Sequence, residues 1–351
     1  MKLEIKTATL SDMLGKAQKG VGNNKLLPIT SFLHLQEKDR TLTITATDIN
    51  NYINVIEKNV VGEDGEVIVP ADQFMKLVSR TTVETIKMEL KEDHLAVKGN
   101  GNYKIPVLNE EYPEYEFDDS VEGKVISTAQ LKNIFTVNKA SLATDMTMPC
   151  LTGFNLGDKA ITTDGVKMCI NEVKVLDEPV LLTQELANLL STLTAEKVMV
   201  KHSDGKLLFT SDNIVVFGAE LAGIEDYPDL NNILAFEYPS KCKLSKVAIS
   251  NVLDRLNIFV SPYDNNGVVL TFTKEGLMLT DVKGENTELV PYLSSENFAD
   301  YMGTVNITLL SALINAIQAD TFELYYGNDT VIKLKDGAVT EILCLMGGDD
   351  E

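Results

Sequence analysis

The feature that most constrains the fold of this chain is an internal repeat. Thr-Asp pairs close strand-like runs three times, and their aspartates, Asp48, Asp164 and Asp281, lie 116 and 117 positions apart. Three units of that length fill the 351 residues. Repeated units of this size predict repeated domains, each with its own core. We therefore expect three domains, at residues 1–120, 121–240 and 241–351.

Each unit carries two segments with helical periodicity. Their apolar residues recur at i, i+3 and i+4, which places them on one face of an α-helix. The six triplets are Leu10, Met13, Leu14; Phe74, Leu77, Val78; Leu131, Ile134, Phe135; Leu186, Leu189, Leu190; Ile249, Val252, Leu253; and Leu310, Leu313, Ile314. Thr183, Asn306 and Pro70 stand where second helices would begin.

Between the helices the sequence alternates apolar and polar residues and is rich in Thr, Ile and Val. Runs such as TLTITATD and VVLTFT predict strands, and turns such as SDGK at 203–206 predict hairpins. The chain is therefore predicted to have an α+β fold, with two helices packed on antiparallel sheets in each domain. The alternative is one large β-rich domain whose amphipathic helices merely look alike.

The charge distribution limits how the chain could bind nucleic acid. A net charge of −21 excludes a protein that grips phosphates over its whole surface. The predicted outward helix faces are more basic, with Lys16, Lys19, Lys76, Arg80 and Arg255 against Asp12, Asp72 and Asp254. These faces favour weak contact with an anion such as duplex DNA, and the alternative is that they are ordinary solvated surfaces.

The sequence contains no recognisable catalytic or metal centre. The three histidines, His34, His94 and His202, lie in or beside strand-like runs, and no GxSxG, HExxH or GxxxxGK[ST] motif occurs. The four cysteines form no CxxC pair, so we expect them to be buried apolar residues. The repeated aspartates are the best candidates for metal or acid–base chemistry, but one per unit is more typical of a turn.

We therefore expect no catalytic residue, metal or cofactor. No secretory signal and no apolar run of membrane-spanning length is found, which predicts a cytoplasmic protein without a membrane partner.

Several motifs together carry a resemblance to one family. They are LLPITSFLHLQ at 26–36, GEVIVPADQFMKLV at 65–78, MPCLTGFNL at 148–156, TDGVKM at 163–168, DYPDL at 226–230 and EILCLM at 341–346. TDGVKM is the most specific of these. Along its full length the chain resembles the bacterial DNA polymerase III beta subunit family, the DNA sliding clamps.

The resemblance implies a processivity factor that is not an enzyme. Two subunits, joined head to tail as a homodimer, would form a ring of six domains, with twelve helices around non-specifically bound duplex DNA. A hydrophobic pocket would receive short motifs of the replicative DNA polymerase, the clamp loader and other proteins. Such an apolar, Met-bearing groove suits many partners.

The resemblance also implies roles for individual residues. Lys25 would join the five outward bases in facing DNA, and Tyr103 and Ile105 of one subunit would contact Phe259 and Val260 of the other. The partner pocket would consist of Leu151, Thr163, Gly165, Val166, Lys167, Met168, Pro228, Ile233, Ile342, Leu343, Cys344 and Met346. Each pocket residue has the alternative role of ordinary core packing.

The chain departs from the family pattern at several places. Lys167 stands for an Arg, Cys344-Leu345-Met346 stands for Met-Pro-Met, and Pro149-Cys150 replaces a frequent aromatic pair. Lys lacks the bidentate fork of Arg. A tail at 347–351 would place three acids beside the pocket. These departures suggest a distant lineage, such as a phage or mobile element.

Two other functions remain open. The first is a protein–protein scaffold on the same triplicated fold that never encircles DNA. The second is a carbohydrate- or metal-dependent hydrolase on a β-rich fold.

Overall fold

The computed structural model describes residues 1–347, in which one order of elements occurs three times, except that the second repeat has four strands between its helices where the others have five. The first repeat contains β1 (Lys2–Lys6), α1 (Thr7–Ala17), β2 (Phe32–Lys38), β3 (Thr41–Thr47), β4 (Asn51–Lys58), β5 (Val61–Glu63), β6 (Gly65–Pro70), α2 (Ala71–Ser79), β7 (Thr85–Leu90), β8 (His94–Lys98) and β9 (Asn102–Pro106). The second contains β10 (Lys124–Ser127), α3 (Thr128–Val137), β11 (Phe154–Leu156), β12 (Ala160–Thr163), β13 (Lys167–Asn171), β14 (Val180–Leu182), α4 (Gln184–Leu190), β15 (Lys197–Ser203), β16 (Lys206–Thr210) and β17 (Ile214–Ala219).

After a connection that holds the short helix α5 (Asn231–Leu234), the third repeat follows the same order. It contains β18 (Ser240–Ser245), α6 (Lys246–Leu256), β19 (Gly267–Phe272), β20 (Gly276–Asp281), β21 (Thr287–Pro291), β22 (Ser294–Glu296), β23 (Tyr301–Asn306), α7 (Ile307–Ala316), β24 (Thr321–Tyr326), β25 (Val331–Asp336) and β26 (Val339–Cys344). The six predicted helices and the α+β class are confirmed. The predicted acidic tail falls largely on residues 348–351, which lie outside the described residues.

The capping predictions for the second helices are also confirmed at two sites. The Thr183 hydroxyl accepts from the Leu186 N–H, and the Asn306 side chain accepts from the N–H groups of Thr308 and Leu309 in α7. These bonds satisfy backbone donors that have no partner inside the helix. Pro70 directly precedes α2, where it offers no side-chain cap.

Equivalent strands of the three repeats take equivalent places in four antiparallel sheets. One set is β1-β7-β8-β9, β10-β15-β16-β17 and β18-β24-β25-β26, and the other is β4-β3-β2-β6, β13-β12-β11-β14 and β21-β20-β19-β23. Two joints fuse successive repeats, since β4 pairs with β17 and β13 pairs with β26. The joints build an eight-stranded and a nine-stranded sheet, to which β22 adds an edge.

Because these joints cross the repeat boundaries, the contacts divide the chain into two compact units. One unit is Met1–Lys132 with Thr183–Glu220, and the other is Asn133–Leu182 with Leu221–Glu351. Each unit therefore takes part of the middle repeat. The division into three domains at 120 and 240 follows the repeated order of elements rather than these contacts, and it stays a prediction.

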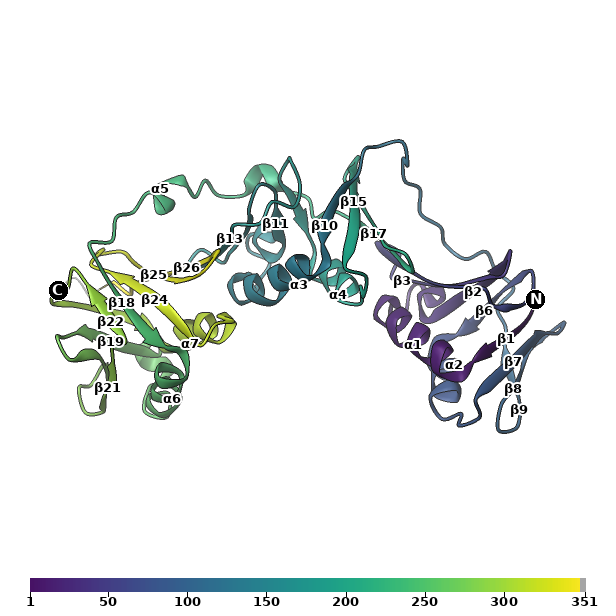
Figure 1. Cartoon of the computed structure of the whole chain (residues 1–351), viewed down its shortest axis with the longest axis horizontal. Coiled ribbons are helices and arrows are strands. Elements are labelled where there is room, and N and C mark those ends of the chain that lie inside the picture. The colour runs from purple at the N-terminus through teal and green to yellow at the C-terminus, as the bar shows by residue number, and fades with distance from the viewer. Residues whose placement is uncertain (348–351) are drawn as a thin grey trace. The chain divides into compact units, whose positions relative to one another are not determined.

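The helices bury their apolar triplets against the sheets of their own unit. In the first unit, α1 packs against α2, β3 and β4, and Leu10, Leu14 and Phe74 are inaccessible to solvent or nearly so. In the second unit, α6 and α7 pack together on one face of the sheet that carries β18, β24, β25 and β26 (Figure 1). Within residues 1–347, no helix is long and apolar enough to cross a membrane.

Candidate functional site

An apolar cluster lies on the face of the nine-stranded sheet opposite α7. Its buried members are Met168, Ile170, Leu230, Val331 and Ile342. Partly buried residues pack against them: Ile161, Tyr227, Ile233, Phe236, Tyr238 and Cys344. We call these eleven residues the apolar surface cluster. Four of them, Met168, Ile233, Ile342 and Cys344, belong to the predicted partner pocket.

Strand pairing explains why these side chains meet. Across the joint, Met168 on β13 lies opposite Ile342 on β26, and Val331 on β25 lies opposite Cys344. Residues directly opposite in antiparallel strands point to the same face of the sheet. The joint between the second and third repeats therefore brings together apolar residues that are about 174 positions apart in the sequence.

The connection between β17 and β18 covers part of this face. Tyr227, a member of the apolar surface cluster, also packs against a neighbouring cluster that holds Cys150 and the predicted pocket residue Leu151. The Tyr227 hydroxyl donates to the Ile161 carbonyl at 3.4 Å, and burial raises the pKa of Tyr227. The predicted residue Pro228 follows it and is half-buried.

Two predicted pocket residues point to the opposite face. Strand alternation turns Lys167 and Leu343 away from Met168 and Ile342, their neighbours in sequence. Leu343 is fully buried in the core beneath α6 and α7. Lys167 is 7 % exposed and forms an ion pair with Asp164. Their side chains therefore lie outside the apolar surface cluster.

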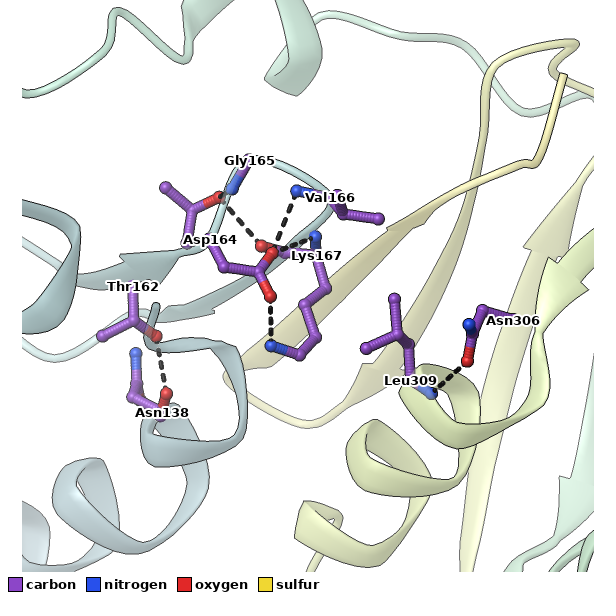
Figure 2. A network of polar contacts seen from close by, with 9 residues as sticks. Asn138, Thr162, Asp164, Gly165, Val166, Lys167, Asn306 and Leu309 are labelled. Carbon is purple, nitrogen blue, oxygen red and sulfur yellow. Dashed lines mark hydrogen bonds and ion pairs between the residues drawn. The ribbon is translucent and has the colours of Figure 1, made fainter. Parts of the chain in front are cut away.

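The turn between β12 and β13 is held by its Thr-Asp pair (Figure 2). One Asp164 oxygen accepts from the N–H groups of Val166 at 2.9 Å and Lys167 at 2.8 Å, and the other pairs with the Lys167 ammonium. Thr163 donates to the Lys167 carbonyl at 2.8 Å. Gly165 has a φ of +90°, which suits a residue without Cβ.

Equivalent turns recur in the other repeats. Asp48 accepts from the N–H groups of Asn50 and Asn51, and Asp281 accepts from the Glu285 N–H and from the side chain of Asn286. The interpretation of these aspartates as turn residues is confirmed. At the position of Gly165, the first repeat places Ile49 with a φ of +86°.

The remaining predicted pocket residues lie at the rim of the sheet. Val166 is 45 % exposed, and its carbonyl accepts from the Cys344 N–H at 2.9 Å. Met346 is half-buried, and its N–H donates to the Thr304 carbonyl. Burial, with the charge of Asp164, raises the pKa of Cys344, so its thiol stays protonated at neutral pH.

The predicted DNA-facing bases differ in whether they form an ion pair with a carboxylate. Lys16 pairs with Asp12 at 2.6 Å, Lys76 pairs with Asp72 at 2.8 Å, and Arg255 makes two hydrogen bonds to Glu288. By contrast, Lys19 donates to the Ser191 hydroxyl. Lys25 and Arg80 are exposed, and neither has a carboxylate partner among residues 1–347.

The structure adds a cation that the helical projection missed. Lys132 on α3 lies close enough to Lys19 to be affected by its charge. The pKa of Lys132 is lowered mainly by burial and, to a smaller extent, by the positive charge of Lys19. Two lysines of the first unit, from different repeats, therefore lie near one another. The sequence holds no local signal for this pairing, because it depends on how α1 and α3 pack.

The predicted subunit-contact residues lie at or near sheet edges. Tyr103, on the edge strand β9, is 38 % exposed, whereas its neighbour Ile105 is buried. Phe259 follows α6 and is 50 % exposed, and Val260 packs against the core. Leu289, on the edge strand β21, is 48 % exposed. Among the described residues, no group of three or more His, Cys, Asp or Glu side chains is arranged to hold a metal ion.

Comparisons with known proteins agree with this architecture. Residues 1–116 match the family described as DNA polymerase III beta subunit, N-terminal domain. The chain is 24% identical to the Beta sliding clamp of Borreliella burgdorferi over 373 residues and 22% identical to that of Rickettsia bellii over 364 residues. These alignments cover 94% and 93% of this chain, and 93% of each relative.

The fold is also that of solved clamps. The beta subunit of the Streptococcus pyogenes DNA polymerase matches with a TM-score of 0.91 and 18% sequence identity, and the match covers 99% of this chain and 100% of that one. The threefold α+β architecture is thus the DNA clamp fold. It defines a sliding clamp, the class of protein that serves as the processivity factor of a DNA polymerase. Within that class, the chain is similar to the bacterial DNA polymerase III beta subunits, whose N-terminal domain its residues 1–116 match, at an identity of 22% to 24% with the two relatives above.

Proposed function

We propose that two copies of this chain close head to tail into a cytoplasmic ring that encircles duplex DNA and tethers the replicative polymerase, with no catalysis of its own. The observation that carries this proposal is the repeated sheet joint. Each joint pairs one repeat's fourth strand, β4 or β13, with the last strand of the next repeat, β17 or β26. The third repeat's equivalent strand, β21, and the first repeat's last strand, β9, are both free edges.

A second copy can satisfy both free edges at once. If β21 of one subunit pairs with β9 of the other, the same joint occurs at every repeat boundary, and neither strand keeps unpaired N–H and C=O groups. Such a contact is heterologous, and two of them close a dimer. The exposed Tyr103, Phe259 and Leu289 would then be covered, which supports the predicted interface. Ile105 is buried within its own subunit, so it would contribute to the interface by shaping β9.

A closed ring needs little binding energy, because it holds DNA by topology. The cations without a carboxylate partner, Lys19, Lys25 and Arg80, would contact phosphates weakly and allow sliding. The net charge of −21 would repel DNA from the rest of the surface. Tethering then raises the effective concentration of the polymerase at the primer end.

Reversing two charges at the C-terminal end of α2 tests the DNA contact. We expect Lys76→Glu with Arg80→Glu to shorten retention on nicked circular DNA about tenfold, because attraction to phosphates becomes repulsion. Sedimentation should still give a dimer. Retention is measured before and after the circle is linearised, since a ring leaves at the new ends.

The matched control is Lys38→Glu with Lys58→Glu, which makes the same charge change at exposed ends of β2 and β4. It should retain DNA normally. Unchanged retention in the α2 variant would refute the DNA-facing assignment of these helices. Binding that ignores linearisation would instead favour the scaffold that never encircles DNA.

The apolar surface cluster is the proposed docking site for partner segments. Its rim residues Ile233, Phe236 and Cys344 remain partly accessible above the buried Met168 and Ile342. An apolar floor that includes a flexible Met side chain can adapt to different peptides. Replicative polymerase, clamp loader and other clamp-binding proteins would therefore share one site. Lys167 and Leu343 would support it from behind rather than line it.

Truncating the floor of the cluster tests this docking. We expect Met168→Ala to weaken binding of apolar partner peptides about tenfold, because it removes a buried side chain worth about 1.5–3 kcal/mol. Fluorescence anisotropy with labelled peptides gives the affinity. Met199→Ala, at an exposed methionine of β15, is the control and should bind normally. Equal losses in both variants would contradict the docking assignment.

A further inference from the structure

The row of side chains that crosses the apolar surface cluster continues beyond it. On five neighbouring strands, directly opposed residues run Met168, Ile342, Lys333, Tyr325 and Lys241. All five therefore point to the same face of the sheet. The apolar half of the row ends at Ile342, and a basic and aromatic half begins at Lys333.

Lys333 sits between two aromatic rings. Its ammonium lies 4.3 Å from the ring centroid of Tyr238 and 4.3 Å from that of Tyr325. Tyr238 is also a member of the apolar surface cluster, so the ammonium is at the border of that cluster. Burial is the main cause that lowers the pKa of Lys333, which means that the charge has lost part of its hydration.

The acids nearby are already engaged. Glu323 accepts from the Tyr325 hydroxyl at 2.7 Å and from Lys241 at 3.2 Å, and Lys241 also pairs with Glu296. No carboxylate among residues 1–347 forms an ion pair with Lys333. The position therefore holds a half-buried cation that is oriented by two rings and lacks an anion.

We propose that Lys333, held between Tyr238 and Tyr325, is a carboxylate-binding subsite that selects partner segments with an acidic group beside their apolar residues. This inference rests on the proposed docking function of the apolar surface cluster. The occupant is a peptide segment of another protein, because a Lys333 ammonium without a carboxylate partner among residues 1–347 is complementary to an anion, and the adjoining floor is complementary to apolar side chains. A partly desolvated ammonium binds a carboxylate more strongly than a solvated one does.

The carboxylate can come from an acidic side chain or from a peptide C-terminus. A series of four labelled peptides separates these sources, all sharing one apolar Leu-and-Phe segment. One has an internal Asp, one has Asn in its place, one ends in a free carboxylate and one ends in an amide. Their affinities are measured by fluorescence anisotropy for the full-length protein and for two variants.

The variants are Lys333→Gln and the matched control Lys335→Gln, which removes an exposed lysine from the same face of the same strand. We expect the unaltered protein to prefer one carboxylate peptide over its neutral counterpart about tenfold, as a charge-assisted hydrogen bond worth about 1.4 kcal/mol would give. Lys333→Gln should abolish the preference while neutral peptides bind within about twofold of normal. Lys335→Gln should keep the preference.

A Lys333→Gln variant that retains the preference would overturn the subsite, and so would one that loses neutral and acidic peptides equally. If the unaltered protein binds all four peptides alike, the subsite fails but the docking function stands. If it binds none, both fail. A further variant ends at Gly347 and therefore lacks the acidic tail. If only this variant gains affinity for carboxylate peptides, the protein's own tail is the occupant, and the assignment to a partner is overturned.

Discussion

The combination Leu289→Asp with Phe259→Asp is expected to convert the dimer into monomers. Both side chains are about half exposed in one subunit, at 48 % and 50 %. Covering each of them in the proposed joint contributes about 1.5–3 kcal/mol. The substitutions remove that contribution and leave two carboxylates buried without partners. We therefore expect the dimer dissociation constant to rise at least about a thousandfold.

Sedimentation equilibrium across a range of protein concentrations measures this effect. The control is Leu26→Asp, which makes the same kind of change at a leucine that is 88 % exposed in a loop of the first repeat. It should remain dimeric. Circular dichroism should show both variants folded, because the substituted side chains lie outside the buried core. A double variant that still sediments as a dimer would refute the β21–β9 joint.

The sequence determines local features of this fold, and these could be predicted. Six helices follow from apolar triplets, because a buried helical face needs a period of 3.6 residues. The turn role of Asp164 and its equivalents follows from a short acceptor beside free backbone N–H groups. What could not be predicted is that β4 pairs with β17 and β13 with β26, since pairing between distant strands leaves no local pattern.

The same limit explains how the candidate site was predicted only in part. The resemblance identified consecutive residues such as Lys167 and Met168, but a strand sends neighbours to opposite faces. The resemblance also did not include Tyr238 or Lys333 in the site. Tyr238 lies in the connection between β17 and β18, and Lys333 lies on the neighbouring strand β25. Because side chains alternate between the two faces along β13 and β26, the predicted pocket could have been narrowed to exclude Lys167 and Leu343. Only the strand register could add Lys333.

Beneath the joint, on the face that Leu343 shares, Glu341 is buried without a partner. It is 1 % exposed, lies opposite Cys169 on β13, and neither of its carboxyl oxygens has a hydrogen-bond partner among the described residues. Burial first, and the charge of Asp336 second, raise the pKa of Glu341 to about 8. Its ionisation would place an uncompensated charge inside the sheet that carries the partner site.

This pKa shift predicts how stability depends on pH. Below an unfolded pKa of 4.5, Glu341 is protonated in both states. Between that value and about 8 the folded protein binds a proton that the unfolded chain releases, so the free energy of unfolding falls as pH rises. At about 1.4 kcal/mol per pH unit, the whole interval corresponds to about 5 kcal/mol, an upper bound for one buried group.

Glu341→Gln removes the titrating group while keeping its shape. We expect its free energy of unfolding, relative to that of the unaltered protein, to increase by about 3–5 kcal/mol between pH 5 and pH 8.5. Urea denaturation at several pH values measures the difference, in which the titration of all other groups cancels. Glu275→Gln makes the same substitution at an exposed hairpin glutamate and is the control against which the difference is judged. A flat difference for Glu341→Gln would mean that the carboxyl keeps an ordinary pKa, and that the joint tolerates a charge beneath the partner site.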